Sequence, residues 1–453
     1  MRCRTKLAKM SVVSTAVIAA LSLLFIFSTR AGAQSAGNNA VCTSTTGCSS
    51  QSPSPAFIDA SVFSSGHSGD VCYQIYLALQ QLRSNGGVID ARGVQVGSGG
   101  AFTCTKTPWT AGSTAITTSS EILLPSGQIN IDQTWVLPNK TRVFGDGMFG
   151  AGVSGGATGG TYLLATSNSV NPMIQFGGLI GGTNVCPLDG SGNYVCTGIS
   201  AENLTLGPAS GNQTVTGILN QYAQDDSYVD QVVLRRIALG LQIGPAGSNF
   251  SAANSGPYTN LFVNQASKCV EIEQSETRGL HGISCVGGDT HAIYLDASNT
   301  TIDDAHIENF STSGVLIGAN GTAEGDVLAN ISAGGTNLPT TVEISSTVSD
   351  LTILGVSYAH LSTAPNGIQD DRTGATTGAN VGLYADGDTL GGGYTLFSTS
   401  SGTGTSAVPS WAVGDTAPSG SSCPTGSIFS NTSTTIGAHA LYVCSGGGWQ
   451  PVI

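Results

Sequence analysis

Charged residues are few in this sequence, and basic ones are the scarcest. Only 9% of the 453 residues are Asp, Glu, Lys or Arg, with 15 basic residues against 28 acidic ones and a formal net charge of −13. An acidic chain is repelled by phosphate backbones and by anionic lipid, so nucleic acid and anionic membranes are poor partners. The same repulsion disfavours direct binding of a polyanionic polysaccharide unless a cation lies between the two.

Strong helix formers are also rare, whereas glycine is abundant with 63 residues. Much Gly, Ser and Thr together with little Lys or Glu suits many short strands joined by tight turns better than it suits helices. Disorder is the alternative, but hydrophobic residues make up 40% of the chain and argue against it. The composition therefore predicts an all-β protein.

Residues 1–33 have the features of a secretory signal peptide. A basic segment (2–9) precedes an apolar run (10–27), and Ala-Gly-Ala at 31–33 has the small-x-small pattern of a cleavage site. An uncleaved membrane anchor is the alternative, because the run is long enough to cross a bilayer. We expect a soluble mature protein with no membrane partner, secreted to the extracellular space or periplasm. Losing the five basic residues of the signal would change the net charge from −13 to −18.

The eleven cysteines agree with export. Without Cys3, which belongs to the signal, ten remain, and they fall into five pairs that are close in sequence: Cys42/Cys48, Cys72/Cys104, Cys186/Cys196, Cys269/Cys285 and Cys423/Cys444. This spacing predicts five local disulfides formed in an oxidising compartment, although sequence alone leaves the connectivity open. A metal site is less expected, because no CxxC pair occurs and the histidines lie elsewhere.

Residues 57–386 begin with a helix and continue with regularly repeated short strands. Asp70 suits the N-cap of a helix, apolar residues recur at helical spacing over 72–82, and Asn-Gly at 85–86 ends it. Two alternating series of apolar strands follow, and four isoleucines of one series stand 24, 24 and 22 residues apart: Ile283, Ile307, Ile331 and Ile353. This is the length of one coil of a parallel β-helix, a solenoid whose N-terminal end the helix would cap.

A β-sandwich is the competing fold because it also contains many short strands, but it does not explain the persistent period. The Ser/Gln/Gly/Pro-rich segment 34–56 is predicted to be a flexible lead, and the Gly/Ser/Thr-rich segment 387–410 a linker. Residues 411–453 are expected to form a small C-terminal β module that needs the Cys423–Cys444 disulfide to hold a core. The alternative for this segment is a flap packed on the last coil.

The segment DVCYQIYLALQQLRSNGGVIDARG, with ILLPSGQINIDQTWVLPNKTRVFGDG after it, resembles the N-terminal region of the pectate-lyase superfamily of right-handed parallel β-helix proteins. In that family a helix precedes a Gly-Gly-apolar strand, and strands that end in Pro-x-Gly or Gly-x-Gly open the first coils. The resemblance covers roughly residues 57–385 and implies the fold more strongly than the activity. It implies a secreted protein that acts on or binds polysaccharide, through glycoside hydrolase or lyase chemistry if it is an enzyme. A non-catalytic surface or adhesin-like protein is the alternative.

Polar residues within the segment 300–310 are the best candidates for catalysis. Alternate side chains of a strand share a face, so three are expected to project outward together: Asp304, His306 and Glu308. Asp303 would lie inward or at the turn. Two carboxylates and an imidazole can act as general acid and base or bind a cation; no cofactor is required, and calcium is the candidate ion. The alternative is that these side chains are simply solvated.

A second group from the preceding coils is predicted to bind substrate: His281, Glu273, Asp289 and His291, with Glu271 beside them. If the coils stack in register, this group would join the first one and form an elongated acidic groove suited to a neutral or cation-bridged polysaccharide. A solvated surface is again the alternative, because Asp289 and His291 adjoin a Gly-Gly turn.

The motifs of standard pectinolytic enzymes are missing. Polygalacturonase-like hydrolases combine an aspartate pair with a Gly-His-Gly segment, which does not accompany the pairs at 225–226 and 370–371. Pectate lyases combine calcium-binding aspartates with an arginine base, yet no lyase motif surrounds Arg235, Arg236 or Arg278. Hydrolysis needs only two carboxylates at a suitable separation, so it is not excluded.

Overall fold

The computed structural model describes most of residues 57–371 and several short strands beyond them. The described ranges are 57–82, 84–148, 159–209, 214–245, 254–273, 277–288, 290–319, 323–335, 340–345, 348–349, 351–359, 366–371, 395–399, 411–414, 428–431, 441–445 and 448–452. The expected signal peptide and flexible lead lie outside these ranges, and all described residues belong to one unit, 41–453. Within the described ranges, no helix is long and apolar enough to cross a membrane.

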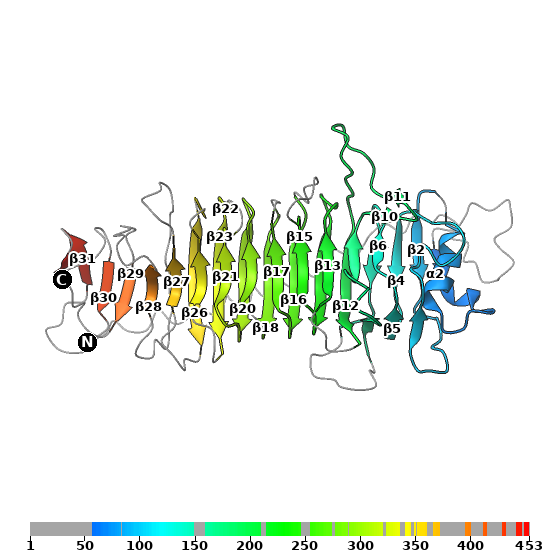
Figure 1. Ribbon diagram of the computed structural model, residues 1–453, viewed down its shortest axis with the longest axis horizontal. Helices are drawn as coiled ribbons and strands as arrows, with labels where there is room; N and C mark the ends of the chain where they lie inside the picture. Colours follow the sequence, from blue (N-terminus) through cyan, green and yellow to red (C-terminus); the bar gives the residue numbers. More distant parts are fainter. Residues whose placement is uncertain are drawn as a thin grey trace, which may run out of the picture. The chain divides into compact units, whose positions relative to one another are not determined.

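Two long sheets form the body of this unit, and Figure 1 shows their strands stacked in a row. Sheet A contains, in spatial order, β1 (Phe57–Asp59), β2 (Gly87–Asp90), β4 (Ser120–Leu123), β7 (Arg142–Phe144), β12 (Ser200–Pro208), β14 (Tyr228–Arg235), β16 (Tyr258–Asn264), β18 (Leu280–Val286), β20 (Thr301–Glu308), β23 (Val327–Gly334) and β26 (Thr352–Ala359). A branch of sheet A contains β3 (Phe102–Cys104), β5 (Gly127–Ile131) and β8 (Thr161–Ala165). Sheet B contains β6 (Trp135–Leu137), β9 (Ile174–Phe176), β13 (Thr216–Asn220), β15 (Leu239–Ile243), β17 (Lys268–Ile272), β19 (His291–Leu295), β21 (Ser313–Ile317), β24 (Thr340–Ile344), β27 (Asn366–Asp370) and β28 (Thr395–Thr399).

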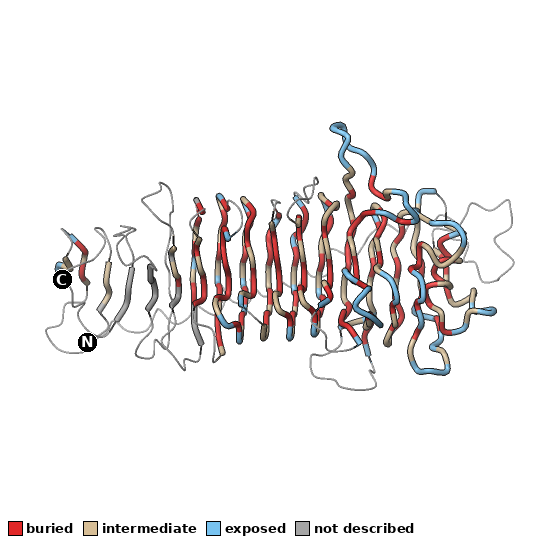
Figure 2. The backbone as a smooth tube through the Cα atoms, in the orientation of Figure 1, coloured by how far each residue is buried: buried red, intermediate tan, exposed pale blue. Residues whose placement is uncertain are grey.

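Every strand pairing within sheets A and B is parallel. Along the chain a strand of sheet A is followed by one of sheet B, as β18 is by β19 and β20 by β21, so each such pair forms one coil. Buried apolar residues line the interior of the coils, and Figure 2 shows them alternating with more exposed positions along the strands. The predicted parallel β-helix is therefore confirmed, and a sandwich, whose sheets are antiparallel, is excluded.

The four isoleucines that are spaced by about one coil in sequence do not stack directly on one another. Ile283 pairs with Ala305, which in turn pairs with Ile331. Ile307 pairs instead with Cys285. Successive coils advance by 22 and then 26 residues at this position, so a constant spacing in sequence does not place residues side by side. All four isoleucines are nevertheless buried in the core.

A column of left-handed backbone conformations divides the long strands of sheet A. It occupies one position in seven successive coils, with φ between 53° and 93°: Asn203, Gln231, Asn260, Gly282, Asp304, Asn330 and Gly355. Asn, Asp and Gly tolerate this conformation better than other residues do, which explains every member of the column except Gln231. The bend interrupts the alternation of inward and outward side chains along the strand. The rule that every second residue shares a face therefore does not hold across the bend.

The expected capping helix is present, although it is shorter than predicted. The N-terminal elements are the 3-10 turn η1 (Ala60–Phe63) and the helix α2 (Val71–Leu79). The Asp70 carboxylate accepts a hydrogen bond from the Tyr73 amide at 3.0 Å, as its N-cap role requires. Gln81 and Leu82 continue with i to i−3 hydrogen bonds, a tighter turn that commonly closes helices. Helix α2 packs against β2 and β3 of the first coil.

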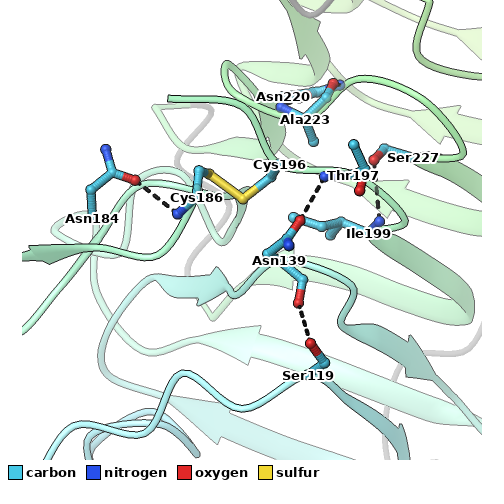
Figure 3. Close-up of a disulfide and its surroundings, with 10 residues drawn as sticks. All are labelled: Ser119, Asn139, Asn184, Cys186, Cys196, Thr197, Ile199, Asn220, Ala223 and Ser227. Carbon is cyan, nitrogen blue, oxygen red and sulfur yellow. Dashed lines mark hydrogen bonds between the residues drawn. A yellow bond between two sulfur atoms is a disulfide. The ribbon is translucent and has the colours of Figure 1, made fainter. Parts of the chain in front are cut away.

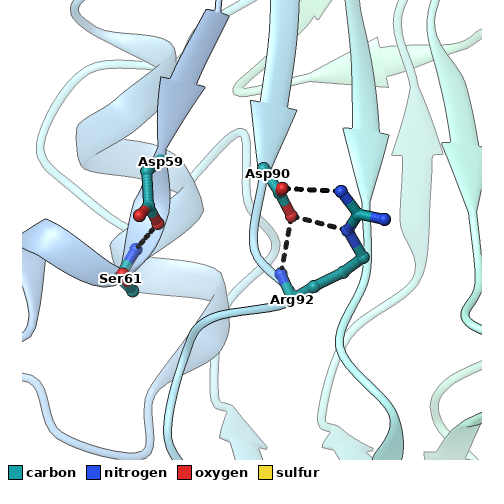
Figure 4. Close-up of polar contacts among 4 residues, drawn as sticks. All are labelled: Asp59, Ser61, Asp90 and Arg92. Carbon is teal, nitrogen blue, oxygen red and sulfur yellow. Dashed lines mark hydrogen bonds and ion pairs between the residues drawn. The ribbon is translucent and has the colours of Figure 1, made fainter. Parts of the chain in front are cut away.

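Two aspartates at the ends of neighbouring strands organise the turns of this first coil (Figure 4). The Asp59 carboxylate accepts a hydrogen bond from the Ser61 amide at 2.9 Å. Asp90 accepts three hydrogen bonds from Arg92, through the amide at 3.0 Å, Nε at 2.9 Å and Nη2 at 2.8 Å. The Arg92 side chain consequently lowers the pKa of the Asp90 carboxyl.

Two of the predicted disulfides are formed, Cys72–Cys104 and Cys186–Cys196, with Cα–Cα distances of 5.1 and 4.6 Å. The second one closes the loop 186–196, and Figure 3 shows it next to Asn184, whose side chain accepts a hydrogen bond from the Cys186 amide at 2.9 Å. The short antiparallel pair β10 (Leu179–Ile180) and β11 (Thr183–Asn184) comes directly before this loop. Cys444 is also disulfide-bonded. Three predicted members of disulfides lie outside the described residues: Cys42, Cys48 and Cys423.

The predicted Cys269–Cys285 disulfide is not formed, and both residues are free, fully buried thiols. Cys269 lies on β17 of sheet B, and Cys285 lies on β18, the sheet A strand of the following coil. Both side chains enter the core, where they form a hydrogen bond with each other. The sequence pairing was therefore right about proximity and wrong about the bond.

The described strands near the C-terminus belong to two different sheets. β28 pairs in parallel with β27, so sheet B continues into the segment predicted to be a linker. A separate four-stranded sheet contains β29 (Trp411–Gly414), β30 (Ile428–Asn431), β31 (Leu441–Ser445) and β32 (Gly448–Pro451). Phe429 packs edge-on against Tyr442 and Trp449, which gives this sheet a small aromatic cluster. The remaining short pair consists of β22 (Ala323–Glu324) and β25 (Val348–Ser349).

Candidate functional site

The predicted catalytic residues all lie on β20 of sheet A. His306 Nε2 is 2.9 Å from Glu308 Oε1, and its Nδ1 is 2.9 Å from Ser332 Oγ on the next coil. Asp304 occupies the left-handed column and is exposed, as is His306. His306 and Glu308 therefore share a face as expected. Both ring nitrogens of His306 already have hydrogen-bonding partners.

Asp303 was expected inward or at the turn, but it faces outward beside His281. The two residues pair across β18 and β20, and His281 Nδ1 lies 3.8 Å from Asp303 Oδ2. Asn330 donates a hydrogen bond to Asp303 Oδ1 at 2.9 Å. The cause is the bend at Asp304, which occupies the turn position itself and leaves the preceding residue on the outer surface.

The structure does not join the two predicted groups into one groove. His281 lies on sheet A with the catalytic candidates, whereas Glu273 follows β17 and His291 begins β19, both in sheet B. Asp289 lies outside the described residues. The two groups are separated because the chain turns from one sheet to the other within each coil, between β18 and β19.

Sheet B carries a second cluster, which we call the polar strip. It is formed by outward side chains of four neighbouring strands, β17, β19, β21 and β24: Lys268, Glu271, His291, Tyr294, Ser313 and Glu343. Register places Glu271 beside Tyr294, and His291 beside Ser313. Leu316 separates Tyr294 from Glu343 in the same row. The strip therefore runs across the strands from coil to coil.

One end of the polar strip is an ion pair. Lys268 Nζ lies 2.7 Å from Glu271 Oε1 and 4.0 Å from the centre of the Tyr294 ring. Gln242 of β15 donates a hydrogen bond to the other Glu271 oxygen at 3.3 Å. These contacts hold the Glu271 side chain in place. They also pair the positive charge of Lys268 with Glu271 and the Tyr294 ring.

The other end of the strip joins three coils through one hydroxyl. His291 Nδ1 lies 2.5 Å from Ser313 Oγ and 3.7 Å from Glu343 Oε2. Ser313 also forms a side-chain hydrogen bond with Glu343. The Tyr294 ring packs edge-on against the imidazole, with 5.1 Å between centroids. His291, Ser313 and Glu343 thus form a continuous polar chain.

The polar strip is far less exposed than the catalytic candidates on sheet A. The side chains of Glu271 and His291 are 11% and 12% exposed, against 47% for His306. Burial, and then the positive charge of Lys268, lower the pKa of His291. Burial raises the pKa of the Glu343 carboxyl, and the Asp371 carboxylate on the next coil adds to this effect. A neutral imidazole and a carboxyl of raised pKa are suited to proton transfer near neutral pH.

Sequence reasoning identified His291, Glu271 and Glu273 in this region but missed four members of the polar strip: Lys268, Tyr294, Ser313 and Glu343. Alignment of the strands CVEIE, AIYLD, GVLIG and TVEIS would have placed Glu271, Tyr294 and Glu343 in one outward row, as the register now does. In the part of the chain that the structure describes, no three His, Cys, Asp or Glu side chains are grouped so that they could hold a metal ion. The calcium ion remains a prediction.

Comparison with known proteins gives likenesses of fold. No protein-family model matches the sequence, and no curated protein matches it. Among solved structures, the chain is similar to DFA-IIIase from Arthrobacter chlorophenolicus A6 without its lid, at 12% identity and a TM-score of 0.38, over 77% of this chain and 92% of that one. It is also similar to the A-modules of the mannuronan C-5 epimerases AlgE6 and AlgE4 from Azotobacter vinelandii, each at 12% identity and over 62% of this chain. The matched regions cover 91% of the AlgE6 module and 88% of the AlgE4 module, with TM-scores of 0.28 and 0.29.

Proposed function

We propose that the protein is exported and acts on or binds a polysaccharide, and that the sugar chain lies along the polar strip of sheet B. The observation that supports this is the half-buried row of contacting side chains from Lys268 to Glu343 on the outside of the coils. Its two end carboxylates, Glu271 and Glu343, are three strand spacings apart, or about 14 Å. That length suits several successive sugar units rather than a small metabolite.

The groups in the strip match the chemistry of sugars. Carboxylate and hydroxyl oxygens accept hydrogen bonds from sugar hydroxyls, and Tyr294 offers an aromatic edge with a polar tip. Lys268 is already paired with Glu271, so the strip has little positive charge to spare. We therefore propose a neutral sugar chain, or an acidic one bridged by a cation such as calcium.

A glycan array together with reducing-sugar and unsaturated-product assays tests this proposal on the full-length mature protein. We expect Glu271→Gln and Tyr294→Ala to weaken binding to the glycan found by at least tenfold. Glu308→Gln on sheet A should leave binding unchanged. Weaker binding in Glu308→Gln and unchanged binding in the other two variants would instead assign the site to Asp304, His306 and Glu308. Binding without turnover would support the non-catalytic, adhesin-like alternative.

Export is proposed on the expected signal peptide and is supported by two local disulfides, Cys72–Cys104 and Cys186–Cys196. Such bonds persist in oxidising compartments and are rare in the cytosol. Expression of the full chain in a bacterial host, followed by fractionation and N-terminal sequencing, is the test. We expect a periplasmic or extracellular product that begins at Gln34. A cytosolic or membrane-bound product that retains residues 1–33 would contradict the proposal.

A further inference from the structure

We propose that His291 is the general base of the polar strip, acting through Nε2, and that Ser313 and Glu343 are positioning residues that hold the proton on Nδ1. This inference rests on the proposed function, because it assigns a role within the same site. It adds a proton-transfer step to what would otherwise be a binding surface.

The direction of the hydrogen bonds follows from what each group can donate. The hydrogen bond from Ser313 lowers the pKa of the Glu343 carboxyl, which is the effect of a hydroxyl that donates its single proton to the carboxylate. The Ser313 oxygen can then only accept from His291 Nδ1, which lies 2.5 Å away. The imidazole is consequently protonated on Nδ1, and the lone pair used for proton abstraction is on Nε2.

Three charged or titratable side chains face the imidazole from the surrounding strands. Burial and then Lys268 on β17 favour its neutral form, whereas Glu343 on β24, with its Oε2 at 3.7 Å from Nδ1, favours the charged form. The Tyr294 ring packs edge-on against the imidazole. The resting base is thus neutral, and the positive charge that it gains on protonation is compensated by Glu343.

In the proposed step, a proton leaves an O–H or activated C–H group of the sugar chain or of a bound water and bonds to Nε2. The electron pair of the broken bond stays on the oxygen or carbon. His291 becomes an imidazolium ion that keeps its Nδ1 proton and its hydrogen bond to Ser313. The step needs no oxidant, reductant or cofactor.

His306 on sheet A provides an internal comparison. Its Nδ1 also meets a serine hydroxyl, that of Ser332 at 2.9 Å, but its Nε2 is taken by Glu308 at 2.9 Å. Among the described residues, His291 Nε2 has no hydrogen-bonding partner in the structure. Of these two histidines, His291 therefore has the free lone pair that a base requires.

Long-range proton–nitrogen NMR of the full mature protein, labelled at its six histidines, reads the tautomer without a substrate. The His291 signal is assigned by its loss in His291→Gln. We expect the Nδ1-protonated tautomer in the parent protein and a mixture of tautomers in Ser313→Ala. Ser332→Ala should move only the His306 signal. An Nε2-protonated His291, or no response to Ser313→Ala, would overturn the proposal.

Turnover of the glycan identified by the array supplies the second readout. His291→Gln should lower kcat by about 10²-fold or more, the usual contribution of a general base. Ser313→Ala should lower kcat more than it raises KM and should move the acidic limb of the pH profile. If kcat and the profile stay unchanged in both variants, the base assignment is wrong even if binding persists. If no glycan binds, only the proposed function fails. The tautomer measurement still tests whether Ser313 and Glu343 hold the proton of His291 on Nδ1.

Discussion

Cys269 and Cys285 meet as a pair of fully buried thiols inside the β-helix, although they come from different sheets and successive coils. Burial, and then the hydrogen bond that its thiol donates to Cys285, raise the pKa of Cys269 well above the ordinary thiol value. The thiolate is the reactive form, so this pair should be inert in the folded protein. We expect a thiol reagent such as Ellman's reagent to leave both cysteines unmodified in buffer and to modify both in denaturant. A peptide containing a Cys269–Cys285 disulfide in non-reduced digests would contradict this expectation.

Asp326 should make the protein less stable as the pH rises. The residue is 1% exposed, Oδ1 accepts a hydrogen bond from the Thr300 amide at 2.8 Å, and Oδ2 has no hydrogen-bonding partner among the residues that the structure describes. Burial raises the pKa of Asp326 from 3.8 to about 7. The folded state therefore holds this proton more tightly than the unfolded state, so its stabilising effect is complete below about pH 4 and is lost as the pH passes 7.

The shift corresponds to about 4 kcal/mol between the two limits. Asp326→Asn keeps an oxygen for the Thr300 amide and removes the charge. We expect urea unfolding at pH 5 and pH 8 to show a smaller loss of stability in this variant than in the parent protein. Equal losses in the two proteins would show that Asp326 is not the group responsible.

The left-handed column predicts opposite responses to two substitutions at Asp304. With φ at 56°, glycine fits this backbone without strain, whereas a β-branched residue does not. We expect Asp304→Gly to change the free energy of unfolding little and Asp304→Val to lower it by about 1–2 kcal/mol. Thr301→Val on the same strand, outside the bend, is the matched control and should be nearly neutral. A similar cost for Asp304→Gly and Asp304→Val would contradict the assignment of the bend.

Tyr258 should stabilise the interior of its coil through its hydroxyl. The ring is fully buried, and the hydroxyl accepts a hydrogen bond from Asn220 at 2.8 Å and donates one to Ser255 at 2.9 Å. Burial raises its pKa to about 12, so the hydroxyl stays protonated. Tyr258→Phe removes both bonds and should cost about 1–3 kcal/mol in urea unfolding, because Asn220 and Ser255 lose a buried partner. An unchanged unfolding midpoint would mean that water replaces the hydroxyl.

The β-helix could be predicted because its signals repeat along the chain. Short apolar strands, a period near one coil and the Asp70-capped helix were all visible in sequence, and each has its counterpart in the structure. The register could not be predicted in the same way. Coil lengths vary with the turns between the sheets, so Ile283 meets Ala305 instead of Ile307. The free thiols at 269 and 285 also escaped prediction, because proximity in sequence does not report whether two sulfurs are bonded.

Sequence reasoning found only part of the polar strip, and the reason is geometric. The segment 300–310 was predicted to be catalytic because its polar residues are close together in sequence. Its outward side chains lie on an exposed face. The polar strip takes one or two residues from each of four strands that are about 20–30 residues apart. Such a site becomes visible only when the coils are aligned in register.

The left-handed column has a further consequence for how this chain can change in length. Within sheet A, the loss of one residue between the bend and the end of the strand would invert the faces of the residues after it and drive His306 toward the core. A whole coil, by contrast, can be gained or lost with both sheets and the bend intact, because each coil contacts only its neighbours. Natural variation in length should therefore come as complete turns or as insertions between the sheets, and the number of turns would set how long a surface the protein presents.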